Sequence, residues 1–250
     1  MPAAPVTSVA PLLWSPPSAM PTVAILQARM TSTRLPGKVL MDVCGVPMLA
    51  LELSRLKACR SIDEIVVATT ANATDEPVVD CADREGVRWF RGSEHDVLGR
   101  YLGAAAEARA DVVVRVTADC PLHDPAVVDR VVGALETGVD YASNMVERTY
   151  PVGLDTEVMW RDVLERVGRI GTSPDAREHV TWFQRFERPE LFVMRDVVQD
   201  GGRDDSDLRW TVDVPEDIER IRRLCEALDL EREFVPFEQV VEYHRSHEMG

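Results

Sequence analysis

The sequence predicts an α/β protein with a mainly parallel sheet and helices on both faces. Three observations support this class. Short segments that are apolar without interruption alternate with helical patterns, and proline or aspartate stands at the start of several of those helices. Strands that are buried on both faces have such continuous apolar runs, and alternating helices are what cover a parallel sheet. The chain has 250 residues, 45% of them hydrophobic and 28% charged, which suits one sizeable globular domain.

The regular part of the pattern covers the first half of the chain. Its expected strands are, in order, Val23–Gln27, Ile65–Thr69, Val87–Phe90 and Asp111–Thr117. All are short and rich in β-branched or apolar residues, as buried strands are. Arg115 is the charged exception inside the fourth strand. Parallel strands of this kind require crossover connections, which are almost always right-handed.

Helical patterns separate these strands. They are, in order, Met48–Leu56, Asp75–Arg84, Asp96–Arg109 and a helix from Pro125 to about Leu135. Pro47 is expected at the first helical position of the first of them, because the missing N–H of proline costs nothing there. Asp124 directly before Pro125 is typical of a helix N-cap.

The alternation stops between about residues 141 and 205. Strand-like patterns at Leu154–Met159 and Leu191–Val198 lie on either side of a predicted helix at Pro174–Phe186. We interpret this part as an inserted subdomain or lid within a single domain of residues 22–250. It is expected to bind the substrate or to form a dimer contact.

Regular structure is expected again near the C-terminus. A strand is predicted at Leu208–Val212, a helix at Pro215–Leu228 and a last helix from about Phe237 to Glu248. At the other end, residues 1–21 contain six of the sixteen prolines and no charged side chain, so we expect a disordered N-terminal tail.

The charge distribution limits the partners. The net charge of −15 disfavours nucleic acid, and no apolar stretch is long enough to span a membrane. The five cysteines form no CxxC pair, which favours a reduced, cytoplasmic protein. Residues 1–41 contain no acidic side chain, but Arg29, Arg34 and Lys38 lie there within ten positions. This basic segment in an acidic chain predicts a site for a small anion.

The basic loop and an acidic strand end are expected to meet. The loop Gln27–Lys38 starts where the first strand ends, and Asp119 follows the fourth strand. Ligands of open α/β sheets bind at the carboxyl ends of the strands. Cationic side chains, with hydroxyl donors from Ser32 and Thr33, would neutralise phosphates, and a lone carboxylate would suit Mg²⁺. The loop has neither a GxxxxGK[ST] nor a GxGxxG pattern, so a P-loop or a dinucleotide site is disfavoured.

The loop Gln27–Lys38 (QARMTSTRLPGK) resembles the signature of the cytidylyltransferases that make CMP-activated acidic sugars. The CMP-Kdo and CMP-sialate synthetases belong to that family, and the SpsF-type spore-coat polysaccharide branch is the most similar. The resemblance continues in order through Val66–Thr69, Arg91–Glu94 with Asp96–Leu98, Arg115–Leu122, Gly153–Glu157, Arg177–His179 and Arg209–Asp217.

This resemblance implies a GT-A-like (Rossmann-like) fold and transfer of CMP from CTP to a small acidic metabolite, with release of pyrophosphate. It further implies Mg²⁺ as cofactor, bound by Asp119 and Asp213, and a possible homodimer. The nucleotide-binding residues it implies are Gln27, Ala28, Arg29, Ser32, Arg34, Lys38, Thr69, Arg91, Ser93, Asp96 and Asp119. The catalytic residues would be Arg29, Lys38, Asp119 and Asp213, and the acceptor-binding ones Arg115, Asp155, Glu157 and His179.

Several of these residues also have a purely structural interpretation. Asp119 and Asp213 precede helix starts and are candidate caps. Arg115, inside a strand, is either a structural ion pair or a substrate contact. Arg177–His179 is interpreted more readily as a structural cluster on a helix face. Asp155 and Glu157, two positions apart in a predicted strand, are expected to face the same side.

Two other functions remain open at this stage. One is a guanylyl- or other nucleotidyltransferase that acts on a sugar 1-phosphate. The other is a nucleotide-binding regulatory module without turnover, which the presence of Lys38, Asp119 and Asp213 disfavours.

Overall fold

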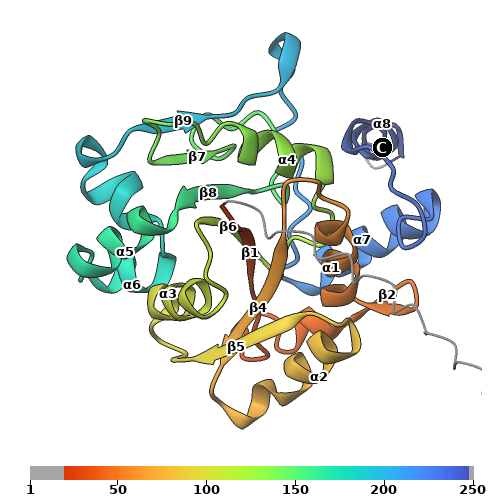
Figure 1. Cartoon of the computed structure of the whole chain (residues 1–250). Coiled ribbons are helices and arrows are strands. Elements are labelled where there is room, and N and C mark those ends of the chain that lie inside the picture. The colour runs from red at the N-terminus through yellow and green to blue at the C-terminus, as the bar shows by residue number, and fades with distance from the viewer. Residues whose placement is uncertain (1–19, 248–250) are drawn as a thin grey trace, which may run out of the picture.

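A seven-stranded sheet forms the centre of the molecule (Figure 1). The computed structural model describes residues 20–247. The strands of the main sheet are β1 (Thr22–Gln27), β4 (Glu64–Thr70), β5 (Arg88–Gly92), β6 (Val112–Thr117), β7 (Tyr141–Ser143), β8 (Glu157–Trp160) and β9 (Met194–Asp196). Their order is β5-β4-β1-β6-β8-β7-β9, and only β8 runs antiparallel to its neighbours. The predicted mainly parallel sheet is confirmed. A separate short hairpin joins β2 (Asp42–Val43) to β3 (Val46–Pro47).

Helices cover both faces of the sheet, as Figure 1 shows. They are α1 (Met48–Lys57), α2 (Glu76–Arg84), α3 (Val97–Glu107), α4 (Pro125–Gly133), α5 (Arg161–Ile170), α6 (Pro174–His179), α7 (Pro215–Leu228) and α8 (Phe237–His247). Successive side chains of β1 point to opposite faces. Ala24 and Leu26 pack with α1, α2 and α4, whereas Val23 and Ile25 pack with α3 and α5. This two-sided burial explains why residues 23–26 of β1 are all apolar.

The predicted helix starts are mostly confirmed. The Asp124 carboxylate accepts hydrogen bonds from the backbone of Ala126 and Val127, and Pro125 is the first residue of α4. Pro215 likewise begins α7. Pro47 differs from the prediction, since it lies one position before α1 and pairs in the hairpin instead.

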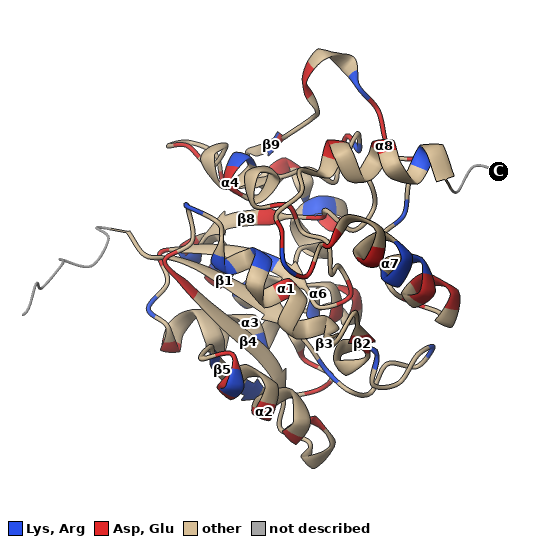
Figure 2. Ribbon diagram, turned by 90° about the vertical axis from the view of Figure 1, so that its right-hand side faces the viewer, with Lys and Arg blue, Asp and Glu red and all other residues tan. Residues whose placement is uncertain are grey.

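Charged residues cluster on the outer helices, as Figure 2 shows for α7 and α2, while the central strands carry few. Within residues 20–247, no helix combines the length and the apolar composition that crossing a bilayer requires. The five cysteines lie in this described part and are all free thiols. Residues 1–19, the larger part of the predicted disordered tail, lie outside the described residues.

Two predicted strands are shorter in the structure. The strand predicted from Leu154 begins only at Glu157, and Asp155 therefore lies outside β8. In the segment Leu191–Val198 only Met194–Asp196 pairs, on the outer edge of the sheet beside β7. Apolar patterns alone do not show where pairing starts, because an edge strand has one neighbour and few ladder bonds.

The helix predicted at Pro174–Phe186 is interrupted. It ends as α6 at His179, Val180 has a φ of +53°, and a π-helical turn follows at Phe183–Glu187. A β-branched residue rarely adopts this backbone conformation. Val180 is fully buried in the core on the α3 and α5 side of the sheet, and this burial compensates for the strained backbone.

The strand predicted at Leu208–Val212 is not formed. Alternate side chains of this segment are nevertheless buried as expected. Leu208, Trp210 and Val212 lie in a core shared with α7 and α8. The backbone, however, makes only one isolated bridge, between Arg209 and Val152. The alternation reflects packing against helices rather than a place in the sheet.

Candidate active site

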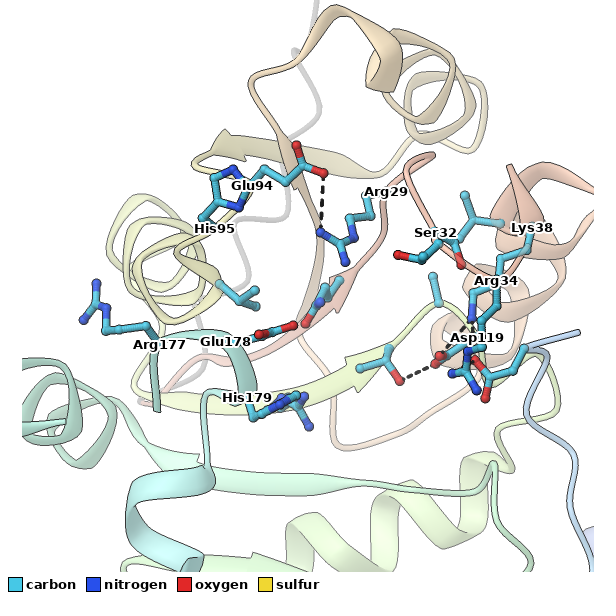
Figure 3. A pocket seen from close by; sticks show the side chains of 18 of the residues that line it. Arg29, Ser32, Arg34, Lys38, Glu94, His95, Asp119, Arg177, Glu178 and His179 are labelled. Carbon is cyan, nitrogen blue, oxygen red and sulfur yellow. Dashed lines mark hydrogen bonds and ion pairs between the residues drawn. The ribbon is translucent and has the colours of Figure 1, made fainter. Parts of the chain in front are cut away.

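A cavity of about 540 Å³ opens at the carboxyl ends of β1 and β6 (Figure 3). Gln27 lines it from the end of β1, and Thr117 and Asp119 line it from the end of β6. The loop after β1, the turn before α3, the α6 helix and the segment before α7 supply the remaining walls. The predicted meeting of the basic loop with the acidic strand end is therefore present.

Lys38 lies at one end of this cavity and joins three distant segments. Its ammonium nitrogen lies 3.2 Å from a carboxylate oxygen of Asp119 and 3.1 Å from one of Asp213, and it donates to the Val212 carbonyl at 2.6 Å. The backbone turns into this position at Gly37, whose φ is +74°. Lys38 is only 8% exposed, so the two carboxylates are what stabilise its charge.

Asp119 is held as a carboxylate. Burial of the group opposes its charged form, but the Lys38 ammonium and a hydrogen bond from Thr117 outweigh burial and keep the pKa of Asp119 below its usual value. Asp124, and not Asp119, caps α4. The capping interpretation of Asp119 is therefore wrong.

Asp213 contacts three cations. Besides Lys38, it pairs with Arg34 at 2.7 Å and with Arg209. Its side chain caps no helix, because the Asp217 carboxylate accepts the backbone N–H groups of residues 213 and 214 at the start of α7. The capping interpretation of Asp213 is also wrong, and its carboxylate faces the cavity.

The pair of Asp119 and Asp213 fits a hard divalent cation. Both carboxylates approach the same nitrogen, so they converge on one point from the two halves of the chain. Within the described residues there is no group of three or more metal-ligating side chains. Two carboxylates without further protein ligands suit Mg²⁺ or Mn²⁺, which take their remaining ligands from phosphates and water.

Behind Asp119 lies a buried acid–histidine pair. His123 Nδ1 is 3.1 Å from a Glu52 carboxylate oxygen, and both side chains are almost completely buried. The second ring nitrogen of His123 contacts the carbonyl of Asp155 at 3.0 Å. Burial raises the pKa of Glu52 to about 7, and the nearby charge of Asp119 acts in the same direction.

Arg29 lines the cavity from a different wall than Lys38 (Figure 3). It lies 3.5 Å from Glu94, whose carboxylate also accepts hydrogen bonds from Thr31 and Asn72. These two hydrogen bonds lower the pKa of Glu94 and fix its charge beside Arg29. Glu94 therefore holds the arginine in place at the cavity wall.

The remaining wall comes from β6 and α6. Arg115 is ion-paired with the buried Glu157, which confirms the structural interpretation, and it also lines the cavity, so its contact with a substrate stays a prediction. Burial alone would raise the pKa of Glu157, but Arg115 and Arg185 keep it below the usual value. Glu178 and His179 are both exposed and line the cavity. The interpretation as a structural cluster is wrong for Glu178, which has no partner among the described residues, whereas the His179 ring also packs on Trp182.

Among the predicted nucleotide-binding residues, five lie in the cavity lining besides Asp119: Gln27, Arg29, Ser32, Arg34 and Lys38. The others lie outside it: Ala28, Thr69, Arg91, Ser93 and Asp96. Thr69 is fully buried, Arg91 pairs with Glu76, and Asp96 caps α3 and pairs with Arg177. Their contact with a nucleotide stays a prediction.

The predicted acceptor residues divide in the same way. Arg115 and His179 line the cavity, whereas Asp155 and Glu157 do not. Asp155 lies before β8 and forms an ion pair with Arg148, so the expected shared face with Glu157 is absent.

Four ionisable side chains of the cavity lining were given no binding role from the sequence: Glu94, His95, Arg177 and Glu178. Glu94, Arg177 and Glu178 belong to segments that carry the family resemblance. Their roles were missed because each depends on the direction of a side chain at a helix end or in a turn, which sequence spacing does not give.

Residues 23–239 match the protein family described as Cytidylyltransferase. Over 206 residues the chain is 32% identical to the spore coat polysaccharide biosynthesis protein SpsF of Bacillus subtilis, which covers 80% of this chain and 84% of that protein. A cytidylyltransferase structure from Leptospira borgpetersenii superimposes with a TM-score of 0.87 at 32% identity, covering 92% and 96% of the two chains.

A more distant likeness supports the fold alone. The structure of CMP:2-keto-3-deoxy-manno-octonic acid synthetase in complex with CTP aligns with a TM-score of 0.63 and 18% identity. The alignment covers 83% of this chain and 99% of that one.

Proposed function

This chain belongs to the cytidylyltransferase family, and we propose that it transfers a cytidylyl group from CTP to a small acidic acceptor and releases pyrophosphate. The proposal rests on one observation, the contact of Lys38 with both Asp119 and Asp213. A compact cation between two carboxylates suits a complex of a metal ion with a triphosphate. Sugar acids, sugar phosphates and phosphonates are the acceptor classes we include.

The basic side chains would bind the triphosphate. Arg29 and Arg34 are partly exposed at the cavity and are free to exchange Glu94 and Asp213 for phosphate oxygens. The planar guanidinium groups of these arginines favour bidentate contacts with phosphate oxygens, and the Lys38 ammonium supplies a compact positive charge. Thr33 and Ser32 line the same wall with hydroxyl groups.

In the proposed reaction an acceptor oxygen forms a bond to the α-phosphorus. The bond from that phosphorus to the bridging oxygen breaks, and pyrophosphate leaves with the electron pair. Fixed cations stabilise the charge that grows on the phosphate oxygens. Asp119 and Asp213 would hold Mg²⁺, which supplies further positive charge there. An acceptor whose attacking oxygen is already ionised needs no protein base.

Residues 141–205 form part of the same proposal. We infer that they are an insertion that carries the acceptor side of the site and joins two copies of the chain. Phe186, Leu191 and Val193 are large apolar side chains in this segment and are exposed, which supports such a contact. Light scattering of the purified protein tests the dimer directly.

Pyrophosphate release tests the function. The protein is incubated with each nucleoside triphosphate, Mg²⁺ or Mn²⁺, and a panel of sugar acids, sugar phosphates and phosphonates. We expect release with CTP and at least one acceptor. Release with GTP and a sugar 1-phosphate would favour guanylyl transfer. Binding of CTP without release in any combination would favour the regulatory module.

A further inference from the structure

Almost all charged groups that line the cavity have a partner of opposite charge within the protein. Arg29 pairs with Glu94 and Arg177 with Asp96, Lys38 pairs with both Asp119 and Asp213, Arg34 shares Asp213, and Arg115 shares Glu157 with Arg185. Among the described residues of the lining, Glu178 is the carboxylate that no cation pairs with and no donor contacts. On the α6 side of the cavity, the Glu178 carboxylate therefore has no charge partner among the described residues.

Glu178 points into the cavity. Figure 3 shows its carboxylate directed toward the middle of the space, on the side away from Lys38 and Asp119. His179 follows it on the same wall. The carboxylate thus faces the part of the cavity that a nucleotide held at Lys38 leaves to the acceptor.

The backbone fixes this position. Ser173 accepts a hydrogen bond from the Ala176 N–H at 3.0 Å and caps α6, and the neighbouring Arg177 pairs with Asp96 of the α3 N-cap. On the other side, the strained and fully buried Val180 ends the helix. Strain that the surrounding structure maintains is typical of functional sites. Glu178 is therefore held at the cavity wall from both sides.

An acceptor that carries only negative charge would be repelled by this carboxylate. We propose that the acceptor is zwitterionic, with an ammonium group that binds Glu178 in addition to the acidic group that reacts. This inference rests on the proposed function. The acidic oxygen forms the bond to the α-phosphorus and pyrophosphate leaves, while the ammonium group remains unchanged. Specificity arises because the Glu178 carboxylate attracts the ammonium group of a zwitterionic acceptor and repels an analogue that carries only negative charge.

Matched acceptors test the proposal. The probes are 2-aminoethylphosphonate with 2-hydroxyethylphosphonate, and glucosamine 1-phosphate with glucose 1-phosphate. Binding of each is measured by calorimetry to the protein loaded with Mg²⁺ and a non-hydrolysable CTP analogue, and kcat/KM is measured with CTP. In at least one pair we expect the aminated member to bind at least about tenfold more tightly than its hydroxyl counterpart.

Two variants assign the effect to Glu178. Glu178→Gln keeps the shape of the side chain and should abolish the preference for the aminated member, while CTP binding stays unchanged. Asp175→Asn removes the same charge from the exposed side of α6, outside the cavity lining, and should leave the preference intact.

The outcomes separate this inference from the function it rests on. The inference is overturned if the wild-type protein binds both members of every pair equally, or if Glu178→Gln keeps the preference. Failure of the proposed function shows instead as a lack of CTP binding, which is measured before any acceptor is added.

Discussion

The two ends of the cavity differ in how their charges are arranged. At the end that we propose for the phosphates, Lys38 is buried between Asp119 and Asp213, and Arg34 and Arg209 also pair with Asp213. At the acceptor end, Glu178 and His179 are exposed side chains on a helix of six residues. In the proposed function, the first end binds a metal ion together with the phosphates of the nucleotide. The second end leaves one charge for the ligand itself to balance.

The two ends also differ in origin. The phosphate end joins residues that are more than 80 and 170 positions apart in the sequence, so it exists only when the sheet and α7 are in place. The acceptor end is local and depends on the cap and the strained termination of α6. Substitutions at the first end should therefore affect nucleotide chemistry, and those at the second should affect acceptor recognition.

The largest effect is expected from Lys38→Ala. Removal of the ammonium group should lower kcat for pyrophosphate release about 1000-fold, or about 4 kcal/mol in the activation barrier. Lys57→Ala is the matched control, because Lys57 is the other lysine of the chain and makes only an exposed pair with Glu85. Equally small losses in both variants would contradict the phosphate role of Lys38.

Asp213→Asn tests the metal at the same end. We expect the Mg²⁺ concentration for half-maximal activity to rise about tenfold to 100-fold, because a neutral amide is a weaker ligand. Asp217→Asn is the control, since Asp217 caps α7 and should lower the melting temperature without changing the metal response. If Asp213→Asn lowers the melting temperature and leaves the Mg²⁺ response unchanged, Asp213 stabilises the fold and does not bind the metal.

Glu52→Gln tests the buried pair behind Asp119 through its pH dependence. The pKa of Glu52 is raised from 4.5 to about 7, and the pKa of His123 is also raised. Between pH 4.5 and about 7 the folded protein therefore binds more protons than the unfolded chain. The stabilising effect of the protonated Glu52 is thus fully present below pH 4.5 and is lost as the pH rises through about 7. Chemical denaturation across this range measures it.

The wild-type protein should lose on the order of 2 kcal/mol of unfolding free energy relative to Glu52→Gln as the pH rises. Parallel pH profiles of the two proteins would rule out this proton uptake.

The smallest effect is expected at the acceptor end. Ser173→Ala removes the cap of α6 and should cost about 1 kcal/mol of local stability. The KM for the acceptor should rise a few-fold while the KM for CTP stays unchanged, because this cap positions α6, which carries Glu178 and His179. Thr172→Ala, one position earlier and exposed, is the control. An equal rise in both KM values would mean that the two ends are not independent.

Sequence reasoning succeeded where one local rule determined the outcome. Asp124 with Pro125, and Pro215, begin helices because a cap or a proline acts within a few residues. It failed at Leu208–Val212 and at Val180, where burial against distant helices decided the backbone. The periodicity of apolar residues indicates that alternate side chains are buried. It does not indicate whether a neighbouring strand or a distant helix buries them.

The sequence by itself determined the family, the continuous apolar strands and the acid-free segment with Arg29, Arg34 and Lys38, because these features lie in neighbouring residues. Only the tertiary structure decided that Asp213 approaches Lys38, that Asp155 lies outside the cavity and that Glu178 points into it. Such outcomes depend on side-chain directions and on contacts between residues far apart in the chain, and these are fixed only when the whole core packs.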